Sequence, residues 1–358
     1  MNNNNVETVV MERAAVQTAV TMVVKLGLDL HAADVVVCRQ DGERLPKPAR
    51  RMTVEQLLEM VAGLRAAGVR VESCYEAGPC GYGLHRRLEA LGAHNVVVVP
   101  RRWDPQGRRV KTDKRDARQL CDALDRHLRG NTDAFSLVRV PDVEQERRRA
   151  ISRQRGMLLK ERQRAVVRGH GLMLMAGFQA PPGWWRAQPW AALAEQLPGE
   201  LRVRVQCWQR QAVELDAAVD EWTAKVEGYA TTPQPKGIGA LTAGSLQLEI
   251  FDWRRFSGRR GISSYTGLCP SEASSGTSRR QGSVTKHGNP RVRHWLVEAV
   301  WRLLEWQPDY PPLRKLRAAT SKRQRKRLAV AAARRLAIDL WRLNTGRCTA
   351  EQLGLRMG

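Results

Sequence analysis

Short apolar runs alternate with amphipathic stretches over residues 23–99, and this alternation constrains the fold more than any other feature of the sequence. Strand-length runs separated by segments of helical periodicity are typical of an α/β domain. The runs and stretches are residues 23–28, 35–38, 54–64, 69–74, 84–91 and 96–99. The first two runs predict an antiparallel hairpin, whereas the later strands follow helices and are expected to be parallel. We therefore predict a mixed sheet in a domain covering residues 23–140.

The pattern changes at about residue 141, where long, charged, mostly helical segments begin. They predict an elongated, coiled-coil-like helical connector over residues 141–230. A Pro-rich joint then leads into a compact, mainly helical C-terminal domain over residues 231–358. Residues 1–22 contain an Asn run without a continuous apolar core, and we expect them to be disordered. The predicted fold class is α/β plus α.

The balance of charges points to a nucleic-acid partner. Sixty Lys and Arg residues against 36 Asp and Glu residues give a formal net charge of +24, for which nucleic acid is the natural counterion. No apolar run is long enough to span a bilayer, so we expect a cytoplasmic protein without membrane association. The basic residues of the connector fit phosphate contacts and a solvated helix face equally well. Seven scattered cysteines without a C-x-x-C pair argue against zinc and disulfides.

Four carboxylates are predicted to lie near one edge of the sheet. Asp29 ends the first strand, and Glu76 follows the strand at 69–74; sites in α/β sheets form where strands end. Asp113 and Asp116 begin an amphipathic helix, and their three-residue spacing puts both carboxylates on one face. Each acid taken alone is also explained by a helix cap or a surface charge.

Basic residues surround the Asp pair. Eight Arg and Lys residues lie between Arg101 and Arg118, among them Lys111 and Arg115, and they offer contacts for a phosphate backbone beside the acidic centre. Magnesium prefers oxygen ligands and keeps several waters. Four carboxylates can therefore hold two ions that activate a nucleophile and stabilise a leaving oxygen. The combination predicts magnesium-dependent phosphodiester chemistry.

A second basic region, residues 258–293, contains a run of hydroxyl residues. Seven Arg and Lys residues stand there against one acid, Glu272, which predicts phosphate binding. Residues 270–277 are small or carry hydroxyls and predict a loop. A serine nucleophile in this loop needs a base or cations that stabilise its alkoxide, and composition alone favours a loop that only contacts phosphates. The residues expected to bind nucleic acid are Lys111, Arg115, Arg279, Arg280, Lys286, Arg291 and Arg293.

Six short motifs follow one another in the chain. They are Gly27-Leu28-Asp29; Tyr75-Glu76-Ala77-Gly78; Lys111-Thr112-Asp113-Lys114-Arg115-Asp116-Ala117; Gly237-Ile238-Gly239; Gly267-Leu268-Cys269-Pro270 with Ser275-Gly276; and Thr285-Lys286-His287-Gly288-Asn289-Pro290 with Arg293. In this order they resemble the motifs of insertion-sequence transposases that join an N-terminal DEDD, RuvC-like (RNase H-like) domain to a C-terminal transposase domain, also called bridge recombinases. The resemblance covers nearly the whole chain, with small departures such as His31 after the first Asp.

The resemblance implies roles for specific residues and partners. Asp29, Glu76, Asp113 and Asp116 would form the DEDD metal-binding set for magnesium. Ser275, directly before Gly276, would be the nucleophile, with Ser274 as the second candidate. Family membership further implies that a structured non-coding bridge RNA pairs with donor and target DNA, while a homo-oligomer, a dimer or tetramer, exchanges strands through a serine–DNA intermediate. The implied location is the bacterial cytoplasm, in association with the nucleoid.

Two alternative functions remain open. A RuvC-like junction endonuclease would hydrolyse DNA with its metal site alone, so that Asp29→Ala but not Ser275→Ala abolishes activity. A non-catalytic nucleic-acid-binding protein would show salt-sensitive binding without any cleavage.

Overall fold

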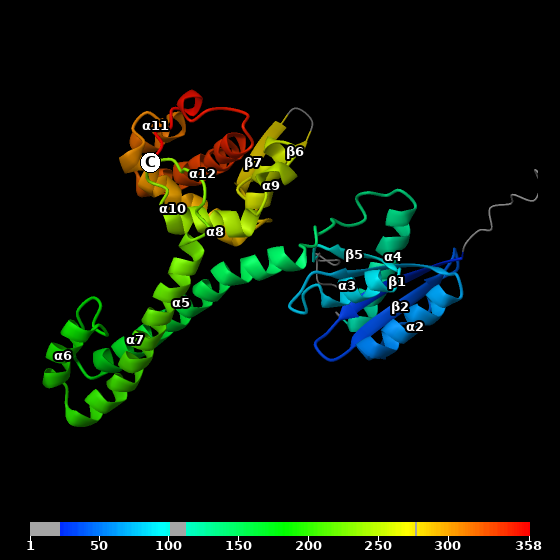
Figure 1. Cartoon of the computed structure of the whole chain (residues 1–358), viewed down its shortest axis with the longest axis horizontal. Coiled ribbons are helices and arrows are strands. Elements are labelled where there is room, and N and C mark those ends of the chain that lie inside the picture. The colour runs from blue at the N-terminus through cyan, green and yellow to red at the C-terminus, as the bar shows by residue number, and fades with distance from the viewer. Residues whose placement is uncertain (1–21, 101–111, 276–277) are drawn as a thin grey trace, which may run out of the picture. The chain divides into compact units, whose positions relative to one another are not determined.

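The computed structural model describes residues 22–100, 112–275 and 278–358. The chain divides into two units, Met1–Val140 and Pro141–Gly358, whose elements are labelled in Figure 1. Residues 1–21 of the segment expected to be disordered, and Lys111, lie outside the described residues. In the part of the chain that is described, no helix is both long and apolar enough to cross a membrane.

The first unit is built on a five-stranded sheet with the order β3-β2-β1-β4-β5. Its strands are β1 (Val23–Leu30), β2 (Val35–Asp41), β3 (Arg50–Met52), β4 (Arg70–Glu76) and β5 (His94–Val98). β1 pairs antiparallel with β2 and parallel with β4, and β4 pairs parallel with β5. The predicted mixed sheet is therefore confirmed. The short edge strand β3 was not predicted, because its sequence, Arg-Arg-Met, has no apolar run.

Helices cover both faces of this sheet. Among the described residues of this unit, the helices are α2 (Val54–Ala66), α3 (Gly83–Ala90) and α4 (Asp113–Leu128). Val35 and Val37 of β2 belong to the same buried cluster as residues of α2 and α3. Val36, between them in sequence, points the other way and packs with Ala117 and Cys121 of α4. This alternation follows from the two-residue period of a strand, and it places α4 on the face opposite α2 and α3.

The second unit begins with two long helices, α5 (Val143–Met175) and α7 (Gly199–Glu227), joined through α6 (Ala187–Gln196). They run antiparallel: Arg155 donates to the Thr223 hydroxyl at 2.7 Å, and further along Arg162 pairs with Asp216. The buried residues of α7 recur every seventh position, at Val205, Ala212, Val219 and Val226. A heptad spacing of apolar residues is the pattern of a coiled-coil seam.

A mainly helical domain follows in the same unit (Figure 1). Its elements are α8 (Ala240–Ile250), α9 (Arg259–Thr266), β6 (Pro270–Ser275), β7 (Ser278–Val284), α10 (Pro290–Trp306), α11 (Arg314–Arg317) and α12 (Lys322–Asn344), with short 3-10 turns at Trp253–Arg255, Pro311–Leu313 and Glu351–Leu353. Leu296 and Val300 of α10 pack with Leu336 and Leu340 of α12 in its core.

The hairpin of β6 and β7 corrects the predicted loop at residues 270–277. Ala273 pairs with Arg280, Ser274 with Arg279 and Ser275 with Ser278. The small polar residues suggested a loop, but pairing with the neighbouring strand decides the backbone conformation here, since strand preference depends on context more than on residue type.

Candidate functional site

Strand β1 and helix α4 approach each other closely at Gly27. A Cβ atom at this position would lie 2.3 Å from the carbonyl oxygen of Ala117 and 2.3 Å from the backbone nitrogen of Cys121. Only glycine permits such an approach of two backbones. The close packing brings the first turn of α4, which carries Asp113, next to the end of β1, which carries Asp29.

Asp29, His31 and Asp113 meet at this edge of the sheet. One ligand atom from each lies within 4.8 Å of the others. The Nε2 atom of His31 is 3.3 Å from Oδ2 of Asp29 and 3.4 Å from Oδ2 of Asp113. The side chains are partly open to solvent, with 24% of Asp29 and 42% of Asp113 exposed. Two carboxylates and an imidazole at this spacing form a donor set that fits a divalent cation.

The surroundings of Asp29 disfavour its negative charge. Burial raises the pKa of the Asp29 carboxyl above its usual value, the charges of Asp113 and Asp116 raise it further, and His31 lowers it. A carboxylate that is crowded by like charges gains from a bound cation, because the cation reverses the local electrostatics. The pKa shift is thus consistent with a cation site.

Arg51 of β3 also reaches this edge. Its guanidinium forms an ion pair with Asp113 and donates at 2.8 Å to Oδ2 of Asp34. Sequence reasoning missed Arg51 as a site residue, since it lies on the strand that was not predicted. His31 carried one signal, its position two residues after Asp29, which puts both side chains on the same side of an extended chain.

The other two predicted acids lie nearby. The parallel register pairs Leu28 with Tyr75, so Asp29 and Glu76 occupy neighbouring strand ends. Asp116 is close enough for its charge to raise the pKa of Asp29. Among the described residues, however, the group within 4.8 Å contains His31 and neither Glu76 nor Asp116.

The predicted serines lie in the β6–β7 hairpin of the second unit. The backbones of Ser274 and Ser275 pair with residues of β7 just before the turn. The side chains of Ser274, Ser275 and Arg279, and all of Gly276, lie outside the described part of the structure.

Two of the sequence motifs form the base of this hairpin. The backbone N–H of Lys286 donates to the carbonyl of Gly267 at 3.0 Å, and that of Thr285 donates to Cys269 at 2.8 Å. Gly288, with a φ of +150°, lies so close that an added Cβ would be 2.5 Å from the Tyr265 carbonyl oxygen and 2.6 Å from the Gly267 nitrogen. Residues 267–270 and 285–290 are therefore one structural element, which joins α9, the hairpin and α10.

The predicted nucleic-acid contacts differ in their surroundings. Arg115, Arg280, Lys286 and Arg291 are exposed. Arg293 is half-buried, and its guanidinium donates to the carbonyl oxygens of Thr266 at 3.1 Å and Lys286 at 3.3 Å. In the structure Arg293 thus ties the two motifs together.

An acidic sheet edge in one unit and a basic, serine-bearing hairpin in the other fit an enzyme that acts on nucleic acid, and comparison with known proteins identifies its class. Residues 234–313 match the family described as Transposase IS116/IS110/IS902. The chain is 33% identical to the putative transposase y4rJ of Sinorhizobium fredii over 304 residues, and this alignment covers 76% of each protein.

Two further relatives agree. The putative transposase y4qE of Sinorhizobium fredii is 31% identical over 242 residues, covering 67% of this chain and 59% of the relative. The transposase for insertion sequence element IS1111A of Coxiella burnetii is 24% identical over 334 residues, covering 89% of both. The chain belongs to the IS116/IS110/IS902 family of transposases, and the expectation of an insertion-sequence transposase is confirmed.

Proposed function

We propose that this transposase cuts and rejoins donor and target DNA with magnesium at the Asp29 edge and with Ser275 as the nucleophile, guided by a structured bridge RNA. The observation that carries the proposal is the meeting of Asp29 and Asp113, from a strand end and a helix start 84 residues apart in sequence, around His31. A crowded pair of carboxylates at a partly open sheet edge is suited to a metal and to a phosphate approaching from solvent.

Asp29, Asp113, Asp116 and Glu76 would hold the metal in this proposal. When bound, magnesium supplies a Lewis acid for phosphoryl transfer. Arg51 forms an ion pair with Asp113 at this edge, and the Arg51 side chain is 53% exposed. Because an exposed ion pair is weak, Arg51 can exchange Asp113 for a DNA phosphate.

The proposed serine step consists of two displacements at phosphorus. The hydroxyl oxygen of Ser275 forms a bond to phosphorus and gives its proton to a base, while the bond from phosphorus to a deoxyribose oxygen breaks and that oxygen takes up a proton. A hydroxyl of the second DNA strand then attacks the serine phosphodiester and releases Ser275. The exposed cations Arg280, Lys286 and Arg291 would stabilise the charge on the pentacoordinate phosphorus.

The C-terminal domain offers a further contact surface for DNA or RNA, which we name the α11–α12 basic surface. No Asp or Glu occurs in residues 310–338. Besides Arg317, whose guanidinium donates to backbone carbonyl oxygens, seven exposed cations lie on α11 and the first turns of α12: Arg314, Lys315, Lys322, Arg323, Arg325, Lys326 and Arg327. Among the described residues none of these seven forms an ion pair with an acid. Such an unneutralised surface favours a phosphate backbone.

Strand exchange also requires more than one nucleophile. Donor and target are each cut, and one serine can hold only one DNA end at a time. We therefore propose a homo-oligomer, a dimer or tetramer, in which each subunit supplies its own serine.

The test is a recombination assay with donor DNA, target DNA, magnesium and the RNA transcribed from the element's flanks. Wild type is compared with Ser275→Ala and Asp116→Ala, and covalent protein–DNA adducts are detected on denaturing gels. The matched control is Ser283→Ala, which removes an exposed hydroxyl from the same hairpin. We expect adducts in wild type and Ser283→Ala and none in Ser275→Ala.

The other outcomes identify the alternatives. Adducts that persist in Ser275→Ala and vanish in Ser274→Ala assign the nucleophile to Ser274. Hydrolysis without any adduct, abolished by Asp116→Ala, indicates a metal-only nuclease. Salt-sensitive binding without cleavage indicates a non-catalytic protein.

A further inference from the structure

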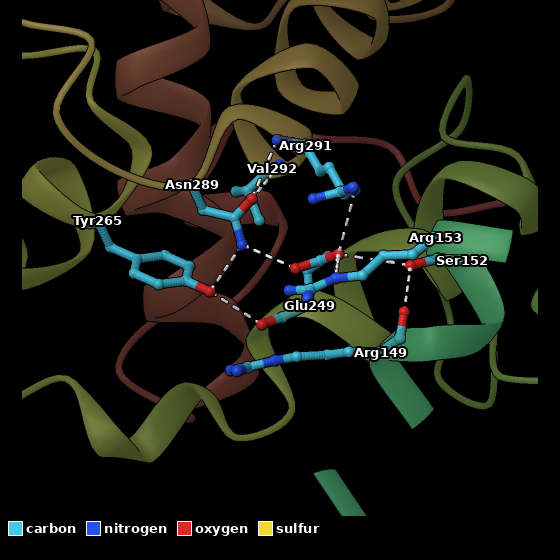
Figure 2. Close-up of polar contacts among 8 residues, drawn as sticks. All are labelled: Arg149, Ser152, Arg153, Glu249, Tyr265, Asn289, Arg291 and Val292. Carbon is cyan, nitrogen blue, oxygen red and sulfur yellow. Dashed lines mark hydrogen bonds and ion pairs between the residues drawn. The ribbon is translucent and has the colours of Figure 1, made fainter. Parts of the chain in front are cut away.

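Glu249 of helix α8 is a carboxylate in the interior of the second unit. Its exposed fraction is 0%, and burying a charge is costly unless it is paired and hydrogen-bonded. Its Oε2 atom accepts a hydrogen bond from Asn289 Nδ2 at 2.8 Å. Its Oε1 atom accepts from Ser152 Oγ and Arg153 Nε, both at 3.4 Å, and lies 3.8 Å from Arg291 Nε. Figure 2 shows these contacts converging on the Glu249 carboxylate of α8 from α5 and from the start of α10.

Asn289 is oriented by this carboxylate. Its Oδ1 atom accepts from the backbone N–H groups of Arg291 at 3.0 Å and Val292 at 3.3 Å, which caps α10. Its Nδ2 atom donates to Glu249 and, at 2.9 Å, to the hydroxyl of Tyr265, which in turn donates to the Glu249 carbonyl at 2.9 Å. Asp or Ser caps a helix as well as Asn does, but neither can also donate both of these hydrogen bonds.

The residues held in this way connect to the serine hairpin. Asn289 directly follows residues 285–288, which pair with residues 267–269 at the base of β6 and β7. Arg291, an exposed cation of the same element, contacts Glu249 itself. The position of residues 285–291 relative to the hairpin is therefore fixed from inside the domain, and the same carboxylate ties it to Ser152 and Arg153 of α5.

We propose that Glu249 is a positioning residue of the transposase. Glu249 holds Asn289 and Arg291, and through them it positions the cations Arg291 and Lys286 beside the phosphate that is attacked in the hairpin. Its contacts with Ser152 and Arg153 also fix the position of this segment relative to helix α5. The catalytic consequence rests on the proposed serine mechanism, whereas the positioning itself does not.

The test exchanges the carboxylate of Glu249 and the amide of Asn289 between the two positions. Glu249→Gln keeps the shape but removes the charge that faces Arg153 and Arg291. Asn289→Asp keeps the helix cap but sets a second carboxylate against Glu249. In the double variant the amide at position 249 donates to the carboxylate at position 289, so the hydrogen bond is restored with donor and acceptor exchanged. Such a double-mutant cycle isolates the coupling between two residues.

Two readouts are measured in each variant. The first is the single-turnover rate of adduct formation together with DNA affinity. We expect each single variant to react about tenfold slower with unchanged affinity, and the double variant to recover most of the rate. The second is amide hydrogen exchange at Arg291 and Val292, which we expect to be about tenfold faster in the single variants and restored in the double variant.

The outcomes separate this proposal from the serine mechanism. Wild-type protein that never forms an adduct refutes the serine mechanism, while hydrogen exchange still decides whether Glu249 holds the segment. Unchanged exchange and rate in Glu249→Gln overturn the proposal, as does a double variant no better than the worse single variant. Should the single variants not fold, Asn289→Ser keeps the helix cap but loses the amide that donates to Glu249, and unchanged exchange in that variant refutes the positioning role.

Discussion

The packing of α4 on Gly27 makes Gly27→Ala the sharpest structural test of the acidic site. The added methyl would lie 2.3 Å from two backbone atoms of α4. Backbone cannot turn aside as a side chain can, so strand and helix must separate by about 1 Å to reach ordinary contact. Overpacking of this kind costs about 1–3 kcal/mol, which for a domain of this size lowers Tm by about 4–12 °C.

The same separation moves Asp113 and Asp116 away from Asp29. Changes that displace metal ligands without removing them typically lower metal affinity about 10–100-fold. We expect Gly27→Ala to lose magnesium and manganese affinity by this factor in calorimetric titrations, and to lose transposition activity with it. Every carboxylate is retained, so the loss would come from geometry alone.

Gly63→Ala is the matched control. Gly63 lies in helix α2 of the same unit, and an added Cβ there meets nothing within 4 Å. Replacing a helical glycine by alanine stabilises a helix by about 1 kcal/mol, so Tm is expected to rise slightly and metal affinity to stay the same. A Gly27→Ala protein with wild-type Tm and metal affinity would refute the argument that this contact assembles the site.

Three further predictions concern charge and backbone. The raised pKa of Asp29 means that the folded state binds its proton more tightly than the unfolded state, so its contribution to stability is lost as pH rises above the ordinary value of 3.8. Asp29→Asn should therefore raise Tm at pH 7 in EDTA and leave Tm unchanged at pH 3. It should also abolish stabilisation by added magnesium in thermal melts. A lower Tm in EDTA at pH 7 would contradict the expected sign of the Asp29 contribution to stability. Replacing Lys322, Arg323 and Lys326 of the α11–α12 basic surface by Gln should weaken nucleic-acid binding and reduce the slope of log affinity against log salt by about one for each phosphate that the variant no longer neutralises. Arg317→Gln, which removes a cation of α11 whose guanidinium already donates to the carbonyl oxygens of Leu304, Gln307 and Pro308, should leave that slope nearly unchanged. Gly288→Ala, whose methyl would meet the Tyr265 carbonyl at 2.5 Å, should destabilise the second unit by about 1–3 kcal/mol in denaturant unfolding, whereas Gly258→Ala, with open space around the new Cβ, should not.

The parts of the fold that sequence reasoning reached are those with a local cause. β1 and β2 are runs of valines and other apolar residues that alternate between two buried faces. Helix α4 begins at Asp113, where Thr112 caps it. Strand β3 and the β6–β7 hairpin lack such signals, because pairing with a neighbouring strand determines them and the partner is not visible in a local pattern.

The same distinction applies to the candidate site. Asp29 and Asp113 were proposed because a strand end and a helix start each display a carboxylate in the sequence. Arg51 joins them only through the tertiary pairing of β2 with β3. Arg293 was expected to bind nucleic acid from its charge, but the carbonyl oxygens it contacts come from residues that only the fold brings near. Charge counts do not distinguish a cation used inside the protein from one left for a ligand.

The seven-residue spacing along α7 has a consequence for how the length of the helical arm, formed by the antiparallel helices α5 and α7, can vary. Val205, Ala212, Val219 and Val226 lie on one stripe only because each step adds two nearly complete helical turns. Adding or removing seven residues in both α5 and α7 changes the arm's length by about 10 Å and leaves the stripe intact, whereas other lengths turn it away from α5. The length of this arm can therefore change in discrete steps of one heptad, about 10 Å each, without loss of the contact between its two helices.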